Sequence, residues 1–254
     1  CWDEPEYKAV FSISLTSDEK YLRVSNEKVL KENKLEDGRV ETLFVDSMKM
    51  STYLVAFVIG ELEVTEVGSV GDTQIRIIHR PGFSHQTSFA GTAGMKILEF
   101  FENYYQIPYP GSKLDLIAIP DFAMGAMENV GAVTFRESLL LIDESKATRQ
   151  ELSRSVSVIA HELAHMWFGD LVTMKWWDGI WLNEAFASLM EAIAANGTYP
   201  EFDQWSEMNL SRSAGFGVDS LKNSRPVEFE VETPEQAEEM FDVLTYEKGS
   251  TVLR

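Results

Sequence analysis

The sequence predicts an α+β protein in which an antiparallel β-region precedes a mainly helical region. Two observations carry this prediction. Over residues 1 to about 79, apolar and polar residues alternate between polar turns, as in strands that bury one face. From about residue 80, apolar residues recur at helical spacing instead. We therefore expect residues 1–79 to be part of a β-domain and residues 80–254 to form a second domain.

The clearest strand patterns lie in the first region, at residues 7–15 and 51–59. These segments read YKAVFSISL and STYLVAFVI. Both are rich in β-branched and aromatic residues, which favour strands, and both lie between polar turns. We expect each segment to be a strand of an antiparallel sheet.

In the second region, a helical pattern at residues 93–105 is followed by an apolar strand pattern at residues 114–119. The next helix has a clear start, because Thr148 and Glu151 have the spacing of a capping box. Apolar residues then recur at helical spacing from Leu152 to Trp167. This helix should therefore be anchored in a core.

Two more helices are predicted towards the end of the chain. One begins near Trp181, after a turn at residues 178–179, and ends at residues 196–197, where the sequence is Asn-Gly. The other runs from Pro234 to about Leu244, because threonine followed by proline suits an N-cap and a first helical position.

The segment HELAH at residues 161–165 has the spacing of a zinc site. On an α-helix His161 and His165 differ by roughly 40° in azimuth, so both imidazoles project from one face. Two histidines at this spacing alone are more typical of a partly exposed helix face. The intervening Glu162 narrows the match, because H-E-x-x-H on a helix is a zinc-hydrolase pattern in which the glutamate is a base.

A catalytic zinc ion needs a third protein ligand besides these two histidines. Glu184 is the candidate, since eighteen residues separate it from His165 and the interval contains the turns that bring the chain back. Glu184 falls in the first turns of the next helix, where it can face the first. The sequence thus predicts one Zn²⁺ per chain held by His161, His165 and Glu184, with Glu162 able to reach a water.

Several motifs closely resemble those of the M1 family of zinc aminopeptidases, which are gluzincins. The zinc motif is followed by NEAF at residues 183–186, and GAMEN at residues 125–129 is similar to the exopeptidase motif of that family. CWDEP at residues 1–5 resembles the family's CxDEP stretch, and YEKG at residues 246–249 resembles its catalytic-tyrosine segment. The resemblance covers essentially the entire chain.

This resemblance implies the later half of an N-terminal β-domain, followed by a thermolysin-like zinc-peptidase domain that is incomplete at its C-terminus. It also implies the same three zinc ligands, and Glu162 as the general base. The tyrosine matching Tyr246 donates its hydroxyl to the oxyanion of the tetrahedral intermediate. A hydroxyl placed where negative charge develops accelerates such reactions.

The resemblance further implies a substrate site at the GAMEN motif. The glutamate matching Glu128 binds the free α-amino group of a peptide, and a carboxylate suits that cation through charge-assisted hydrogen bonds. The neighbouring backbone lines the cleft. The substrate-binding residues implied are therefore Gly125, Ala126, Met127, Glu128 and Asn129.

A few positions depart from the family's pattern, but none of them removes a ligand or a donor. Met166, Asp170 and Ala185 stand where glutamine, asparagine and glycine are common. Without the family resemblance, Glu128 would be a loop carboxylate and Tyr246 a half-buried aromatic side chain.

The function expected from these motifs is zinc-dependent hydrolysis of the N-terminal bond of peptides with a free N-terminus. One alternative is a non-catalytic peptide-binding relative, which typically loses the ligands or the base that are intact here. A second is an epoxide hydrolase of the leukotriene A4 hydrolase type, which resembles GGMEN, so Ala126 counts against it. A thermolysin-type endopeptidase is a third, against which Glu128 argues.

Composition limits which binding partners and which cellular compartment we expect. A formal net charge of −19 disfavours nucleic acid and anionic membrane surfaces as partners. The single cysteine excludes an internal disulfide, and no apolar run is long enough to span a membrane. We expect a cytoplasmic protein. The chain starts without methionine and stops within a helical pattern, so we interpret it as a piece of a longer protein with weak or no turnover of its own.

Overall fold

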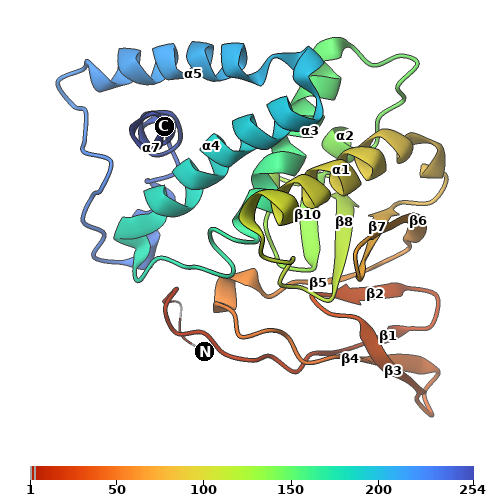
Figure 1. Cartoon of the computed structure of the whole chain (residues 1–254). Coiled ribbons are helices and arrows are strands. Elements are labelled where there is room, and N and C mark those ends of the chain that lie inside the picture. The colour runs from red at the N-terminus through yellow and green to blue at the C-terminus, as the bar shows by residue number, and fades with distance from the viewer. Residues whose placement is uncertain (1, 3) are drawn as a thin grey trace.

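The computed structural model describes residue 2 and residues 4–254 and confirms the α+β class. Short strands from the beginning of the chain lie together at one end of the molecule, and the long helices occupy the other end (Figure 1). Cys1 and Asp3 of the CWDEP stretch lie outside the described residues.

Two small antiparallel sheets form the first part of the chain. β1 (Ser14–Asp18), β4 (Arg39–Phe44) and β3 (Val29–Lys34) pair in the order β1-β4-β3. The second sheet pairs β2 (Leu22–Ser25) with β5 (Phe57–Gly60). The predicted antiparallel character of this region is confirmed.

The strand predicted at residues 7–15 is wrong for most of its length. This segment runs beside residues 44–50, but regular pairing is interrupted because the Ser47 hydroxyl accepts from the backbone N–H of Phe11 at 2.9 Å. Among residues 4–13, the only β-pairing is an isolated bridge between Ala9 and Met50. The strand predicted at residues 51–59 is also partly wrong.

That second error arises from a short 3₁₀ turn, Thr52–Leu54, which stands where the strand was expected. The turn places the side chain of Leu54 in the core with no exposed surface. The apolar pattern therefore predicts correctly that Leu54 is buried, but not that its backbone is extended. The strand begins only at Phe57.

A five-stranded mixed sheet supports the helices, with the order β6-β7-β8-β10-β9. Its strands are β6 (Glu63–Val70), β7 (Thr73–His79), β8 (Lys113–Ile119), β9 (Ala126–Met127) and β10 (Ala132–Arg136). β8 lies parallel to both β7 and β10, whereas β9 is an antiparallel edge strand. The strands of this sheet come from both sides of residues 79–80, where we expected a domain boundary. That boundary stays a prediction.

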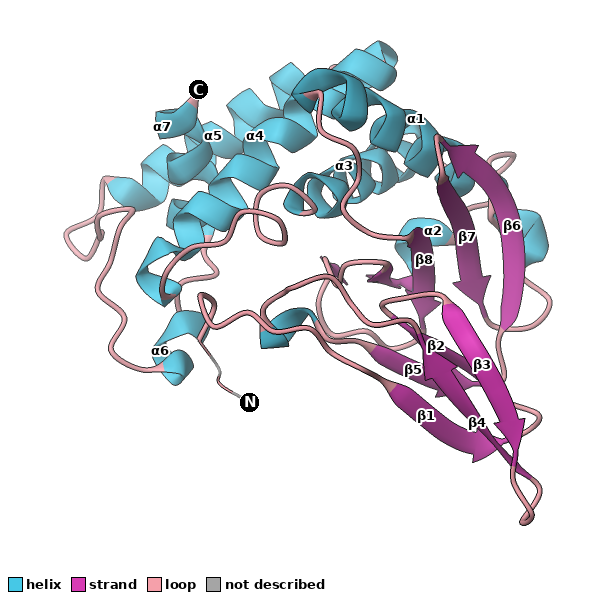
Figure 2. Cartoon of the chain, turned by 60° about the horizontal axis from the view of Figure 1, so that its bottom comes forward, coloured by secondary structure: helices cyan, strands magenta, loops and turns pink. Residues whose placement is uncertain are grey.

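The two faces of this sheet pack against different parts of the molecule (Figure 2). Leu116 and Phe135 point into the large core shared with the helices, which includes Ile97 and Ile159. Ile117, on the opposite face, belongs to a smaller core with side chains of β2 and β5. Successive side chains of a strand point to opposite faces of the sheet, so this one sheet packs against the helices on one face and the β-region on the other.

The long helices confirm most of the predicted elements. They are α1 (Ser88–Tyr105), α3 (Arg149–His165), α4 (Ile180–Thr198) and α5 (Gln204–Asp219), and the short ones are α2 (Glu137–Leu140), α6 (Pro234–Glu238) and α7 (Gly249–Leu253). The capping box of α3 is confirmed, since the Glu151 amide donates to Thr148 Oγ1 at 3.2 Å and the Thr148 amide donates to Glu151 Oε2 at 2.8 Å.

The helix predicted from Pro234 to Leu244 is wrong in length. α6 ends at Glu238, and the chain turns before a π-helical segment, Leu244–Lys248. The Asp242 carboxylate accepts from the amides of Leu244 and Thr245 at 3.0 Å each, so it caps the new segment. Aspartate is a common residue at helix starts, so the sequence contains a second start signal within the range where we expected one helix.

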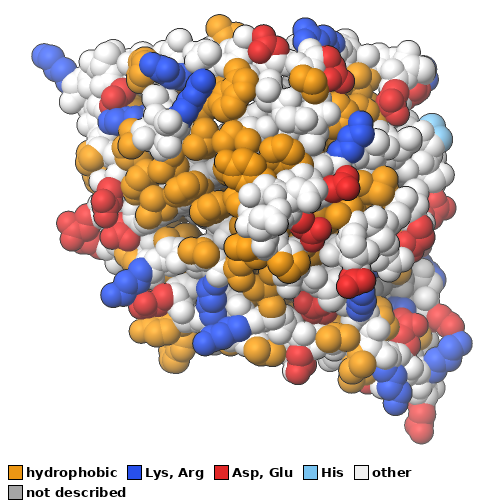
Figure 3. All heavy atoms as spheres, in the orientation of Figure 1, with side chains coloured by type: hydrophobic (Ala, Val, Ile, Leu, Met, Phe, Trp, Pro, Cys, Tyr) orange, Lys and Arg blue, Asp and Glu red, His pale blue; other side chains and the backbone are white. Residues whose placement is uncertain are grey.

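Apolar side chains are exposed on α5 and α7, including Leu210, Phe216 and Val252. Figure 3 shows hydrophobic side chains gathered on the face where α4, α5 and α7 lie. Among the helices of residues 4–254, none is both long and apolar enough to cross a membrane.

Candidate active site

Three donor atoms from two helices converge between α3 and α4. His161 Nε2 lies 3.1 Å from His165 Nε2 and 3.2 Å from Glu184 Oε2, and His165 Nε2 lies 3.4 Å from the same oxygen. The structure thus brings together the three residues predicted as zinc ligands. The donors of a tetrahedral zinc ion at about 2.0–2.1 Å are separated by roughly 3.3 Å, so this donor set fits the ion.

The Nδ1 atoms of the two imidazoles face away from the three converging atoms, and their hydrogen bonds determine where the ring protons lie. His161 Nδ1 lies 3.2 Å from Glu191 Oε2, and His165 Nδ1 lies 3.0 Å from the carbonyl oxygen of Phe168 and 3.2 Å from Asn183 Oδ1. A carboxylate and a carbonyl only accept, so Nδ1 carries hydrogen in both rings. In the neutral rings the lone pairs of the two Nε2 atoms would then point at each other and repel. A proton or a metal cation between them removes this repulsion.

Without a metal ion, protons take that place. Burial lowers the pKa of His161, but hydrogen bonds with Glu184 and Glu191 outweigh burial and raise it to about 9. For His165, burial again opposes the charge, and the carboxylates of Glu128 and Glu184 raise its pKa well above the usual range. Burial would raise the pKa of Glu184, but the two histidines hold it well below its usual range. The centre therefore favours positive charge.

Glu162 points towards the same centre from α3 and is 6% exposed. Burial raises the pKa of its carboxyl to about 8, against the lowering effect of His161 and His165. Its oxygen belongs to a group with Glu128 and His165 whose ligand atoms all lie within 4.8 Å of one another. Glu162 is therefore a buried carboxylate beside the predicted metal site, as the motif indicates.

Glu128 follows β9 and is also 6% exposed. Across residues 4–254, no group is recorded as donating a hydrogen bond to its carboxylate. A buried carboxylate is stabilised by a positively charged partner, and Glu128 contributes an oxygen to the same group of ligand atoms as Glu162 and His165. A cation that enters beside Glu128 would supply such a partner.

The remaining GAMEN residues lie along the edge of the sheet. Ala126 and Met127 pair with Phe135 and Thr134 of β10, and the Gly125 carbonyl accepts from the Arg136 amide at 2.9 Å. Within residues 4–254, the other edge of β9 has no partner strand.

Gly125 and Ala126 line an open cavity of about 1180 Å³ together with His161, Glu162 and Tyr246. Asn129 points elsewhere, because its Nδ2 donates to the carbonyl of Leu54 at 3.3 Å. Contact of Met127 and Asn129 with a substrate stays a prediction.

Tyr246 reaches the site from the π-helical segment rather than from a regular helix. Its ring centroid lies 6.0 Å from that of His161. Burial raises the pKa of its hydroxyl well above the usual range, and the negative charge of Glu184 adds to this. The hydroxyl therefore keeps its proton at neutral pH and can donate it.

Two functional contacts were missed by sequence reasoning. Glu191 and Asn183 hold the outer nitrogens of His161 and His165, and partners of this kind orient metal-binding histidines. A signal was present for Glu191, which lies seven residues after Glu184 and so faces the same side of α4. Asp170 was noted only as a departure from the family, yet both oxygens of its buried carboxyl group lack a partner among the described residues.

An H-E-x-x-H helix and a distant glutamate that meet beside a mixed sheet form a candidate metal site of the metallopeptidase type. Comparison with known sequences agrees. Residues 89–254 match the Peptidase family M1 domain, and residues 1–54 match the Peptidase M1 N-terminal domain. The chain belongs to peptidase family M1.

Curated relatives match along the whole chain. The chain is 43% identical to the Puromycin-sensitive aminopeptidase of Caenorhabditis elegans, 46% identical to Endoplasmic reticulum aminopeptidase 2 of Homo sapiens and 42% identical to Aminopeptidase M1-A of Oryza sativa subsp. japonica. Each comparison covers 100% of this chain but only 26–29% of the relative. The chain therefore spans little more than a quarter of the length of these proteins.

Proposed function

We propose that the protein containing this chain is a zinc-dependent aminopeptidase that hydrolyses the first peptide bond of peptides with a free N-terminus. The observation that carries this proposal is the convergence of His161 Nε2, His165 Nε2 and Glu184 Oε2 within 3.4 Å beside the buried carboxylate of Glu128. The first feature suits a metal ion and the second suits an amine.

One Zn²⁺ per chain would be held by His161, His165 and Glu184, and when bound it would polarise a carbonyl and acidify water. Glu162 would act as general base: it takes a proton from the attacking water and then delivers that proton to the departing amine. Tyr246 would donate a hydrogen bond to the carbonyl oxygen as negative charge develops there.

Glu128 would bind the substrate's α-ammonium group and so place the first peptide bond beside Glu162. A second residue between the amine and the scissile bond would move that bond about 3.3–3.6 Å away, which general-base chemistry does not tolerate. The unpaired edge of β9 would accept the extended substrate backbone. This arrangement favours removal of one residue at a time over internal cleavage.

Metal content and one assay test the proposal in the full-length protein. We expect one zinc ion per chain, and cleavage of a free-amine aminoacyl substrate that is far faster than cleavage of its N-acetylated twin. Zinc without cleavage would favour a peptide-binding relative or another substrate class. Cleavage of both twins at similar rates would indicate an endopeptidase. Cytoplasmic localisation remains a prediction, and labelling of cells with a tagged full-length protein would test it.

Zinc binding is expected to release protons and to tighten as the pH rises. His161, with its pKa raised to about 9, is protonated at neutral pH in the metal-free protein, and a ligand must lose that proton. Affinity should therefore rise about tenfold per pH unit for each proton released. The contribution of His161 should level off above about pH 9, whereas His165, whose pKa is raised well above the usual range, adds to the proton count. Titration calorimetry in two buffers of different ionisation enthalpy counts these protons. A count of zero at pH 7 would contradict the assignment.

A further inference from the structure

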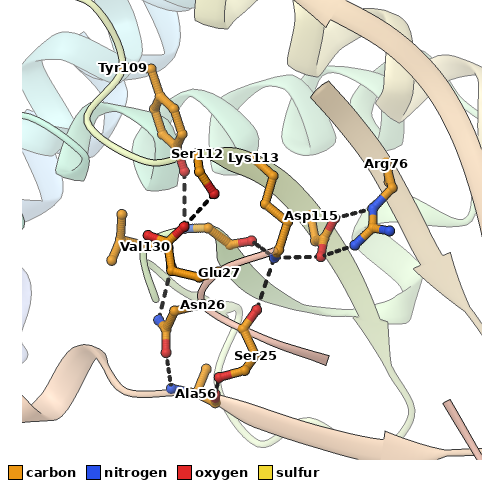
Figure 4. A network of polar contacts seen from close by, with 11 residues as sticks. Ser25, Asn26, Glu27, Ala56, Arg76, Tyr109, Ser112, Lys113, Asp115 and Val130 are labelled. Carbon is orange, nitrogen blue, oxygen red and sulfur yellow. Dashed lines mark hydrogen bonds and ion pairs between the residues drawn. The ribbon is translucent and has the colours of Figure 1, made fainter. Parts of the chain in front are cut away.

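A buried polar network connects the N-terminal β-region with the residues that follow Glu128 (Figure 4). Asn26, just after β2, is at its centre. Its Nδ2 donates to the carbonyl of Val130 at 2.9 Å and to that of Leu54 at 2.8 Å, and its Oδ1 accepts from the Ala56 amide at 2.9 Å. The side chain is 1% exposed. Asn26 therefore holds a carbonyl that lies 104 positions away in the sequence.

Lys113 holds the next carbonyl along the chain. Its Nζ donates to the Gly131 carbonyl at 2.6 Å, to the Ser25 carbonyl at 2.9 Å and to Asp115 Oδ2 at 2.6 Å. Asp115 also accepts two hydrogen bonds from Arg76, each at 2.7 Å. All three donors of the ammonium group are satisfied by fixed partners. Displacing the Gly131 carbonyl would leave a buried donor unpaired.

Three further features restrict Gly131. Its N–H donates to the Tyr109 hydroxyl at 3.0 Å. Its φ of +75° suits glycine, and a β-carbon at this position would overlap the carbonyl oxygen of Asn26. A turn closes around it, because the Ala132 amide donates to the Asn129 carbonyl at 2.9 Å. The backbone of residues 129–131 is thus fixed on both sides.

Glu128, in contrast, has no recorded hydrogen bond to its carboxylate from any described residue. Its place is therefore set by the backbone around it. Before it, Met127 pairs with Thr134 in the sheet, and after it comes the segment held by Asn26 and Lys113. A binding group must be held to within about 0.5 Å, and support for it comes from neighbouring hydrogen bonds.

We propose that Asn26 and Lys113 are positioning residues for Glu128, which they place by fixing residues 129–131. The N-terminal β-region thereby takes part in recognition of the substrate's amino group, although Asn26 does not touch the substrate. This inference rests on the proposed aminopeptidase function, because only there does the exact place of the Glu128 carboxylate matter.

Asn26→Ala in the full-length protein tests the inference, since it removes the donation to Val130. A shift of the binding carboxylate weakens amine binding more than the chemical step. We expect KM for a free-amine aminoacyl 4-nitroanilide to rise about tenfold while kcat changes less than about threefold. Selectivity against the N-acetylated twin should fall by about the same factor, with zinc content unchanged.

Ser25→Ala is the matched control. Its hydroxyl donates to the Ala56 carbonyl at 2.8 Å, so the variant loses a buried hydrogen bond at the same contact but none to residues 129–131. We expect a similar fall in melting temperature with KM unchanged. Equal rises of KM in the two variants would overturn the inference, because general loosening would then explain both.

Hydrogen exchange supplies a measurement that does not depend on activity. The amides of Gly131 and Ala132 should exchange faster in Asn26→Ala than in Ser25→Ala. If Asn26→Ala does not fold, Lys113→Met provides a second test, since it keeps most of the stem and leaves Asp115 paired with Arg76. Unchanged KM and unchanged exchange in the variants of an amine-selective wild type would overturn this inference alone. A wild type without amine selectivity would overturn the proposed function, and this inference with it.

Discussion

Glu162→Gln is expected to lower kcat by about 10²–10⁴ while the protein keeps its zinc ion. The substitution keeps the size of the side chain but removes the carboxylate that takes the proton. The converging atoms of His161, His165 and Glu184 are untouched, so the metal site persists. Steady-state kinetics and zinc analysis of the same preparation measure both halves of the prediction.

Ser188→Ala provides the control for this experiment, because Ser188 lines the same cavity and its hydroxyl makes no hydrogen bond to residue 2 or residues 4–254. Its kinetics should stay near those of the wild type. Two results would contradict the role of Glu162. One is loss of zinc in Glu162→Gln, which would make the residue a ligand. The other is a kcat close to that of the wild type, which would leave the reaction without this base.

The metal centre could be predicted from the sequence because its geometry is mostly local. Helical spacing alone places His161 and His165 on one face. Glu184 required one further step, which was to see that the interval turns the chain back onto the next helix. The capping box at Thr148 is likewise a pattern within four residues, and the structure contains it.

Contacts between distant segments could not be predicted in this way. Asn26 and Val130 lie 104 positions apart, and no periodic pattern relates them. The same holds for the parallel pairing of β7 with β8, which places the end of the β-region in the sheet that carries the GAMEN motif. Pairing of this kind depends on tertiary packing, which outweighs local preference.

The segment before Tyr246 shows a related limit. Threonine and proline at residues 233–234 mark a helix start correctly, but they say nothing about its end. Asp242 ends the pattern by accepting two backbone N–H groups and opening the π-helical segment that carries the tyrosine. π-helical turns are rare overall, but those that occur are frequently found at functional sites.

Glu128→Ala is expected to abolish most of the preference for a free amine. Hydrogen bonds to a charged partner contribute about 1.5–3 kcal/mol, which corresponds to roughly 10- to 150-fold in binding. The loss should appear mainly as a higher KM for free-amine peptides. Because N-acetylated substrates never used this contact, their cleavage should change little, and the ratio of the two kcat/KM values measures the effect.

Glu128→Gln separates charge from shape in the same assay. The amide keeps the size of the side chain and one acceptor oxygen, so a site that needs only a hydrogen bond would tolerate it. A site that needs negative charge would not, and we expect Glu128→Gln to lose nearly as much selectivity as Glu128→Ala. Unchanged selectivity in both variants would contradict amine binding by Glu128. In that case the buried carboxylate of Glu128 could bind a different cation, and metal analysis of the wild type would detect a second metal ion beside Glu128, Glu162 and His165.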